Sequence, residues 1–512
     1  MPSGRQRFLL FVLMFQSFSS DDMNNSIRTY PFIDVFAGAG GLGEGFLSCG
    51  SRQIKFTAGA SVEKEAIPCR TLVLRHFFHS FSGRKIPGAY YKYISGEIDR
   101  ATLFEHYPQE AEDAEKSVLC WDMDSSTRDS LNAALQKRLG NATHWVLVGG
   151  PPCQAYSLAG RSRRKDDPFF ADDPKHTLYR QYLDILESLA PSVFVMENVP
   201  GLISARLDGS STLERITEDL RHAGSCGYRL YSLSNGKELK DSSDFRELVI
   251  NARDYGVPQS RRRLFILGIR ADIRIKPGTL KSRQTVSAGE AIRDLPVVRS
   301  RISRAGDSLE NWIRTIEGIR DIDMSCIDES VRSRIVSQLE KISSFRDRQT
   351  EEPSAFARLM RDEFLHEAPQ HTPRSHMQSD LQRYFYAAIY AEVTGKSPKL
   401  QDFPAELLPR HKNIAGKPGT AVFNDRFRVQ LKDEPSSTVT AHIRKDGHYF
   451  IHYDPLQCRS LTVREAARLQ SFPDNYFFEG NRTEQYQQIG NAVPPLLASQ
   501  IAEIVADILD RL

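Results

Sequence analysis

Residues 149–157 read GGPPCQAYS and place a single cysteine directly after two prolines. The preceding apolar run, Trp145 to Val148, is typical of a buried strand that the glycines and prolines end. Cys153 would then lie on a stiff loop at the rim of a sheet, where α/β enzymes keep their reactive groups. A thiolate there could be a nucleophile, yet a lone cysteine in a turn is more often a small buried residue. Taken alone, Cys153 favours the second interpretation.

Basic residues follow this cysteine closely. Arg161, Arg163, Arg164 and Lys165 lie in one short segment. Nearby positive charge would favour the thiolate form, and the same residues could hold nucleic-acid phosphates. A solvated basic loop is the simpler alternative.

Two further motifs carry charges at predicted strand ends. Residues 196–201 read MENVPG, so Glu197 could be a buried acid with a raised pKa, or a strand-end cap. Residues 254–263 read DYGVPQSRRR, and strand alternation sends Arg261 and Arg263 to the same side. An ordinary basic edge strand would look the same.

A glycine-rich turn indicates a ligand site. Residues 36–43 read FAGAGGLG between a predicted strand and a helix, which suits close approach of a ligand to the backbone. Glu63 and Asp122 end the next two strands, and acids there could bind a ribose and an adenine amine. Each acid could instead cap a helix. Asn491, in the sequence QIGNAVPP, could touch the same ligand or cap the last helix.

Apolar stretches alternating with helices must position these residues. We expect a doubly wound, mostly parallel α/β sheet with a helix at 179–189 and strands at 32–36, 57–62, 118–121, 145–148, 192–196 and 264–268. Beyond it the alternation stops, which predicts a second, smaller mixed domain with helices at 330–365 and 380–395 and short strands within 420–453. Two helices, 463–470 and 495–509, follow. The predicted division is a disordered tail (1–29), a catalytic domain (30–273), a second domain (274–480) and a returning segment (481–512).

Composition narrows the class of protein. The 512 residues are 40% hydrophobic and 26% charged, with a net charge of +3, as in a soluble globular protein that tolerates a nucleic-acid partner. Seven scattered cysteines argue against a disulfide framework and a zinc site, and favour a cytoplasmic location. The apolar segment 8–15 follows two arginines like a signal peptide, but it is too short to span a membrane.

Together, the motifs resemble the DNA cytosine-5 methyltransferase family of bacterial restriction-modification type. The blocks, in the family's order, are FAGAGG (36–41), PPCQ (151–154), ENV (197–199), QSRRR (259–263), RSLTVREAARLQSFP (459–473) and GNAV (490–493). Such a set of ordered blocks is far more specific than any one of them. The resemblance turns Cys153 from a structural residue into an expected nucleophile.

The resemblance implies a reaction. Cys153 would add to C6 of a cytosine flipped out of the duplex, and C5 would then attack the methyl group of S-adenosylmethionine. Glu197 would bind N3 and the amino group, and Arg263, with Arg261 beside it, the O2 side. Loss of the C5 proton and elimination of Cys153 would release 5-methylcytosine.

The same resemblance implies binding residues. Those expected at the cofactor are Phe36, Gly38, Gly40, Leu42, Glu63, Asp122, Pro152, Leu178, Asn491 and Val493. Those expected at DNA are Gln154, Ser157, Arg161, Arg163, Gln259, His442, Arg444 and Lys445, with Arg383, His411, Arg426 and Arg428 as further candidates. The segment 438–448 is the preferred base-reading element, although any one basic residue there could serve only a phosphate or solvent.

Two other functions stay open at this point. An enzyme of the same fold could act on tRNA, and a DNA-binding module could have lost catalysis. The large second domain disfavours the first, and the joint presence of Cys153, Glu197 and Arg263 disfavours the second. The expected partner is double-stranded DNA, without membrane or metal. We expect a monomer, and a restriction endonuclease that acts on the same site without direct contact.

Overall fold

The computed structural model of the protein describes residues 27–51, 53–123, 126–152, 178–207, 209–304, 306–409 and 424–512. Cys153 and most of the predicted tail therefore lie outside the described residues. So do Gln154, Ser157, Arg161, Arg163 and His411. The first strand begins at Arg28, one residue before the predicted end of the tail at residue 29.

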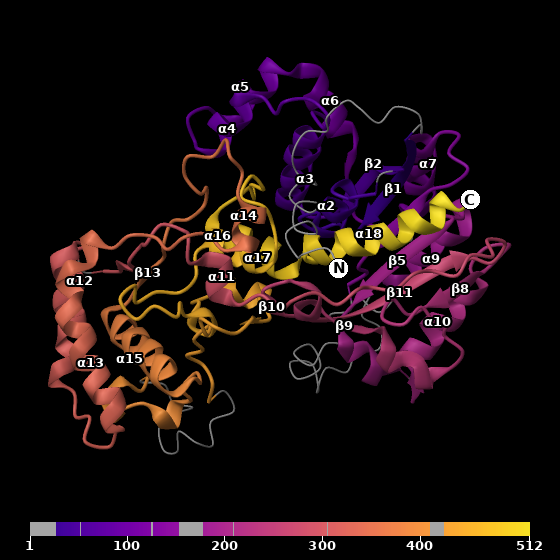
Figure 1. Cartoon of the computed structure of the whole chain (residues 1–512). Helices are drawn as coiled ribbons and strands as arrows, with labels where there is room; N and C mark the ends of the chain where they lie inside the picture. Colours follow the sequence, from indigo (N-terminus) through magenta and orange to yellow (C-terminus); the bar gives the residue numbers. More distant parts are fainter. Residues whose placement is uncertain are drawn as a thin grey trace, which may run out of the picture.

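A central sheet organises the first half of the chain (Figure 1). Among the described residues it has eight strands, in the order β3-β2-β1-β4-β5-β11-β8, with β9 paired to β11. The first five strands in this order are parallel, and β11 runs antiparallel to both neighbours. The bounds are β1 Arg28–Val35, β2 Ile54–Glu63, β3 Val118–Cys120, β4 Val146–Gly149, β5 Val193–Asn198, β8 Tyr228–Tyr231, β9 Val249–Asn251 and β11 Arg262–Arg270. The predicted mostly parallel α/β sheet is confirmed, and β8 and β9 are the strands that the sequence did not predict.

Alternating side chains give this sheet two apolar faces. Phe32 and Val148 face the first core, which the sheet shares with the helices α2 (Gly41–Leu47) and α18 (Pro495–Asp510). Ile33 and Leu147 face the opposite core. That second core is completed by α7 (Arg128–Leu139), α9 (Leu178–Leu189) and α10 (Thr212–His222). Helices thus cover both faces, as in a doubly wound fold.

The strand order reverses between β1 and β4. Strands β2 and β3 extend the sheet from one side of β1, while β4 and β5 extend it from the other. Ligands bind at such a switch point, outside the carboxyl ends of the strands. The loops after β1, β2, β4 and β5 therefore define where a site should be sought.

One apolar segment would pass a length and composition test for a membrane helix. Within the described ranges it is Arg482–Asp510, and 89% of its most apolar window is buried in the protein. This stretch comprises α17 (Arg482–Asn491) and α18, and α18 packs along α2. Its apolar character is accounted for by the core that it completes.

Four helices lie between β2 and β3 in the sequence and form a small layer of their own. They are α3 (Ala66–His79), α4 (Gly88–Ile94), α5 (Arg100–His106) and α6 (Pro108–Lys116). Their buried residues, among them Phe77 and Tyr90, make a separate apolar cluster. In Figure 1, α4 and α5 project away from the sheet.

A third core lies within the second half of the chain. It is built from residues between Ile302 and Cys458. Its helices are α12 (Leu309–Glu317), α13 (Glu329–Lys341) and α15 (Gln378–Thr394). The shorter α11 (Ala288–Ile292) and α14 (Ala355–Met360) pack instead against the first core. The helices predicted at 330–365 and 380–395 are present, the first of them broken in two.

The predicted strands within 420–453 are mostly wrong. Two 3-10 turns, η10 (Ala441–Arg444) and η11 (His448–Phe450), occupy the segment instead. Extended pairing there is limited to β14 (Ser436–Ser437) on β10 (Gln259–Ser260) and isolated bridges such as Val429 to Ile451. The Arg374 guanidinium donates to the backbone carbonyls of Ile443 and Lys445. Side-chain donors thus replace the ladder that strands would have formed.

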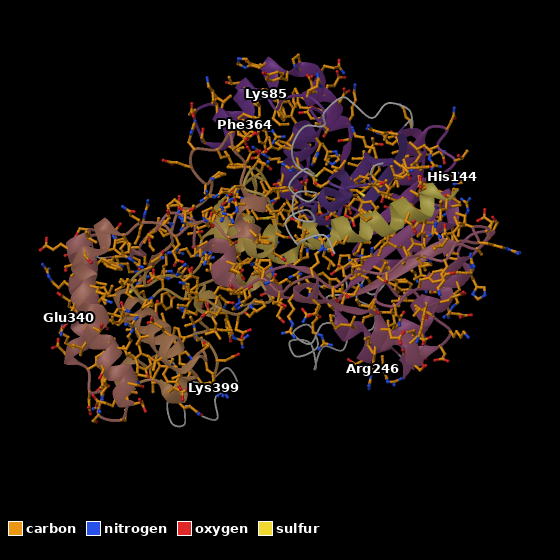
Figure 2. The ribbon with its side chains drawn as sticks, in the orientation of Figure 1. Lys85, His144, Arg246, Glu340, Phe364 and Lys399 are labelled. Carbon is orange, nitrogen blue, oxygen red and sulfur yellow. The ribbon has the colours of Figure 1, made fainter. Side chains whose placement is uncertain are left out.

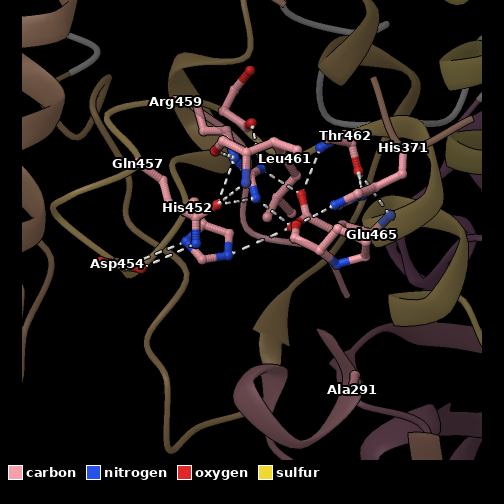
Figure 3. A network of polar contacts seen from close by, with 12 residues as sticks. Ala291, His371, His452, Asp454, Gln457, Arg459, Leu461, Thr462 and Glu465 are labelled. Carbon is pink, nitrogen blue, oxygen red and sulfur yellow. Dashed lines mark hydrogen bonds and ion pairs between the residues drawn. The ribbon is translucent and has the colours of Figure 1, made fainter. Parts of the chain in front are cut away.

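A buried polar network joins the two halves (Figure 3). Both oxygens of Glu465, in α16 (Val463–Leu469), accept from the Arg459 guanidinium at 2.6 Å, and His452 lies 3.5 Å away. Thr462 and Glu465 form a capping box at the start of α16. The RSLTVREAARLQ block (459–470) is thus buried, and its charged side chains have hydrogen-bond partners within the protein. Residues from Leu461 onward pack in the first core, although the predicted second domain extends to 480.

Candidate active site

Glu197 and Arg263 form an ion pair at the end of two neighbouring strands. The Nε of Arg263 lies 3.0 Å from Oε1 of Glu197, and the side chains are 16% and 15% exposed. Burial raises the pKa of Glu197 above its ordinary value, while the charges of Arg263 and Arg261 act in the opposite direction. The pair combines a carboxyl whose pKa lies above its ordinary value with a neighbouring cation, and both side chains are partly exposed to a ligand.

The loop that leads to Cys153 is fastened to the strand that carries Glu197. The side-chain amide of Asn198 donates to the carbonyl of Pro151 at 3.2 Å. A Cβ added to Gly150 would lie only 2.7 Å from Oε2 of Glu197. Any side chain at position 150 would therefore displace the Glu197 carboxylate. Pro152 is half-buried and ends the described part of this loop.

The glycine-rich turn meets Glu63 as expected of a ligand loop. Phe36, Gly38 and Gly40 all have positive φ, at 55°, 55° and 79°. The backbone N–H of Gly38 donates to Oε2 of Glu63 at 2.7 Å, and its other oxygen accepts from the next two backbone amides. Asp122 lies at the neighbouring strand end, in an ion pair of 2.7 Å with Lys64. The two predicted acids thus share one edge of the sheet.

The segment after α17 reaches this turn. A Cβ on Gly41 would lie 2.1 Å from the carbonyl oxygen of Val493, so the two backbones touch. Leu42, next along α2, is buried beneath them. Asn491 is the exposed last residue of α17, and the N-cap of the last helix, α18, is Pro494 rather than Asn491. Leu178 begins α9 at the next described position after the Cys153 loop.

Asp34 is a candidate residue that the sequence reasoning missed. It lies near the carboxyl end of β1, fully buried, and its Oδ2 accepts from the Gly43 amide at 3.2 Å. Its other oxygen has no hydrogen-bond partner among the described residues. Burial raises the pKa of Asp34 to about 8. An acid inside the apolar run FIDVF was the signal that could have revealed it.

Two residues of the QSRRR block lie elsewhere than expected. Arg261 is fully buried and donates to the carbonyls of Val439 and Gly490, at 2.8 and 3.2 Å. Its guanidinium thereby has structural partners, so we correct its role from catalysis to positioning. Alternation failed here because Arg261 precedes the first residue of β11.

Gln259 was expected at DNA, yet its side chain is fully buried. Its amide nitrogen donates to the Leu469 carbonyl and to the side chain of Gln470, and its oxygen accepts from the Val439 amide. A side chain with every polar atom satisfied inside the protein is not available to read a base. This expectation is corrected.

The predicted base-reading segment is partly accessible. Arg444 and Lys445 are exposed on η10 and its C-terminal flank, and Arg444 contacts Gln487 of α17. His442 is half-buried, with its ring against that of Tyr449. Arg383, by contrast, is buried and bonded to the Leu407 carbonyl, which removes it from the candidates.

Comparison with known proteins decides the family. The model of the C-5 cytosine-specific DNA methylase family matches residues 120–506. The chain belongs to this family. It is a DNA (cytosine-5-)-methyltransferase, with the mostly parallel sheet expected of that fold.

Individual relatives cover most of this methyltransferase. It is 33% identical over 500 residues to the Type II methyltransferase M.Bpa9945I of Bacillus paralicheniformis, covering 93% of this chain and 99% of the relative. It is 29% identical to the Type II methyltransferase M.DdeI of Desulfomicrobium norvegicum, with 70% and 72% covered. A solved structure of a prophage-encoded E. coli protein, described as a DNA modification methyltransferase, matches with a TM-score of 0.52 at 18% identity. That match covers 94% of this chain and 99% of the other, and supports the fold.

Proposed function

We propose that this methyltransferase moves a methyl group from S-adenosylmethionine to C5 of a cytosine flipped out of a specific DNA duplex, through a covalent adduct with Cys153. One observation carries the proposal. The Glu197–Arg263 pair stands at the end of β5, and the loop into Cys153 is fastened beside it through Asn198 and Pro151. An acid, a cation and the residues that lead to Cys153 thus lie at one end of the sheet, which supports the proposal.

The residues would divide the work on the ring. The Cys153 sulfur adds to C6, which makes C5 electron-rich, and Glu197 in its protonated form donates to N3 as charge develops there. Burial, which raises the pKa of Glu197, favours that proton. Arg263 would bind O2 while holding Glu197. Removal of the C5 proton and expulsion of the thiolate complete the exchange.

The residues present fit S-adenosylmethionine, which supplies the methyl group when bound. A Cβ on Gly38 would meet no atom within 4 Å, so open space lies in front of the glycine-rich turn. Glu63 closes one side of that space through the Gly38 amide, with Asp122 on the adjacent strand. We propose that Glu63 binds the ribose and that Asp122 binds the adenine. Asn491 and Val493, from the returning segment 481–512, would form one wall of the pocket. Phe36, Gly40, Leu42, Pro152 and Leu178 would complete the pocket.

For DNA reading we propose the unit 274–480, with Arg444 and Lys445 of the η10 segment as exposed candidates. Two exposed cations on one short turn suit base edges or phosphates. The named relatives are Type II methyltransferases, which supports a modification role beside a restriction endonuclease. We further propose that the enzyme acts in the cytoplasm as a monomer on duplex DNA, without a metal.

Bisulfite sequencing tests the proposal in one experiment. DNA from cells that express the wild-type protein should carry 5-methylcytosine at one short sequence, and DNA from cells that express Cys153→Ala should not. Labelled methyl donor offered to duplex DNA and to tRNA in vitro separates the two substrates. Label in tRNA alone would replace the proposed function with the RNA alternative, and label in neither would favour an inactive binding module.

A further inference from the structure

A hollow of about 440 Å³ opens on the catalytic half, beside the proposed active site. It is lined by Pro200, Ile203, Ser204, Arg246, Val249 and Arg262. These residues come from η2 (Pro200–Ser204), η3 (Ser242–Leu248) and the strands β9 and β11. Figure 2 labels Arg246 at the edge of the catalytic half, on the side of β9 and α10. Segments distant in the sequence thus share one surface depression.

The two arginines of this hollow are unlike most others in the molecule. Both are exposed, and neither guanidinium has a hydrogen bond or ion pair with any residue in the described part of the chain. The acids near Arg246 are already engaged: Glu247 accepts from Asn235, and Asp244 from the Lys240 amide. The hollow therefore presents uncompensated positive charge, which an anion could neutralise.

The rest of the lining is apolar and small. Pro200, Ile203 and Val249 offer carbon surface, while Ser204 adds a hydroxyl near the rim. A ligand suited to this combination carries one anionic group next to an apolar or sugar-like body. A backbone nucleotide of DNA, with its phosphate and deoxyribose, has this composition.

Position links the hollow to the reacting base. Pro200 follows Glu197 by three residues, and Arg262 directly precedes Arg263, which is ion-paired to Glu197. Three residues of extended chain span at most about 10 Å. Alternation along β11 sends Arg262 away from the face that carries Arg263. The hollow thus flanks the Glu197–Arg263 pair.

We infer that this hollow binds a backbone phosphate and its deoxyribose close to the target cytosine, with Arg246 and Arg262 clamping the phosphate. The inference rests on the proposed function, since it takes DNA as the substrate. A phosphate held there would fix the strand while the neighbouring nucleotide leaves the stack. The site would position the DNA strand and add to the affinity for DNA, but it would not distinguish one base from another.

The salt dependence of DNA binding tests the inference. Fluorescence anisotropy on a labelled mixed-sequence duplex gives log K against log salt for the wild type and for Arg246→Gln/Arg262→Gln. The double variant should lose about 0.9 from the magnitude of the slope, the value for one phosphate contact. The matched control is Lys137→Gln/Arg138→Gln, which removes the same two positive charges on α7, a helix that packs against β2 and α9.

The outcomes distinguish failure of the phosphate site from failure of the proposed function. An unchanged slope in Arg246→Gln/Arg262→Gln, or an equal loss in Lys137→Gln/Arg138→Gln, would overturn the inference. Thermal unfolding followed by circular dichroism shows whether the double variant is folded, and single variants replace it if it is not. Methyl transfer by the wild type to unmodified genomic DNA, which contains every short sequence, is measured in parallel. Failure of that reaction refutes the proposed function, whereas transfer with an unchanged slope refutes only the phosphate site.

Discussion

The guanidinium of Arg261 donates a hydrogen bond of 2.8 Å to the backbone carbonyl of Val439, 178 residues further along the chain. A second bond of 3.2 Å reaches the carbonyl of Gly490 at the end of α17. A Cβ on Gly490 would lie 2.2 Å from the amide nitrogen of Ala441, so these two backbones are in direct contact. One buried side chain therefore holds the catalytic strand, the proposed base-reading segment and the returning segment together.

Replacement of Arg261 by methionine should destabilise the protein by about 3 kcal/mol, because two buried carbonyls lose their donors. Equilibrium urea unfolding gives the free energy. The matched control, Arg262→Met, lies one residue away on the exposed side and should change the free energy by less than about 0.5 kcal/mol. Equal effects of the two substitutions would show that the Arg261 bonds do not stabilise the junction.

Replacement of Glu197 by glutamine should lower the rate of methyl transfer by about 100-fold or more, because glutamine cannot pass between the charged and protonated forms as charge develops on the ring. Steady-state kinetics with labelled cofactor measure the rate. Cofactor affinity, measured by calorimetry, should stay within a few-fold of the wild-type value. A variant with a normal rate would remove Glu197 from the proposed chemistry.

Asp34 should make stability depend on pH. Its native pKa is raised to about 8, so the folded protein keeps a proton that the unfolded chain has released above a pH of about 4. The free energy of unfolding should therefore fall as pH rises between these values, with one proton contributing about 1.4 kcal/mol per pH unit. Asp34→Asn should flatten the profile by that one proton. Parallel profiles of the two proteins would mean that Asp34 is ionised in the folded state.

Cys153 should form a covalent adduct with duplex DNA that carries 5-fluorocytosine at the modified position. Fluorine replaces the C5 proton whose loss precedes expulsion of the thiolate, so the complex cannot resolve after methyl transfer. Denaturing gel electrophoresis detects the adduct. Cys153→Ser tests the thiol with minimal change in volume and should give no adduct. An adduct with that variant, or none with an active wild type, would contradict the thiol attack.

The central strands were predictable because buried parallel strands read as continuous apolar runs, as in Val146–Gly149 and Val193–Asn198. The resemblance implied that Glu197 and Arg263 meet the same cytosine ring, but their ion pair across β5 and β11 was not predicted. The structural roles of Arg261 and Gln259 could not be predicted. Both side chains bond to residues near 439, 469 and 490, and local strand alternation carries no information on such distant contacts. The strands expected within 420–453 failed for the same reason, because long-range side-chain donors replaced local pairing.

Asp34 could have been found in the sequence by a different kind of signal. A single acid in an apolar strand carries no motif, so the signal is the cost of burying it rather than its spacing. Ordered motif blocks located the chemistry, whereas burial and hydrogen bonding revealed which members of each block face inward. Gln259 and Arg261 belong to the same block as Arg263, and only Arg263 meets Glu197 in an ion pair.

The packing of α18 along α2 has a consequence for biosynthesis. During translation α2 and its glycine-rich turn leave the ribosome long before α18, and until then one face of the sheet lacks its cover. The intervening residues can assemble their own apolar centre during that interval. Nascent chains should consequently depend on chaperones or remain loosely folded on that face, and acquire cofactor affinity late in synthesis, in a step that joins two distant stretches of chain.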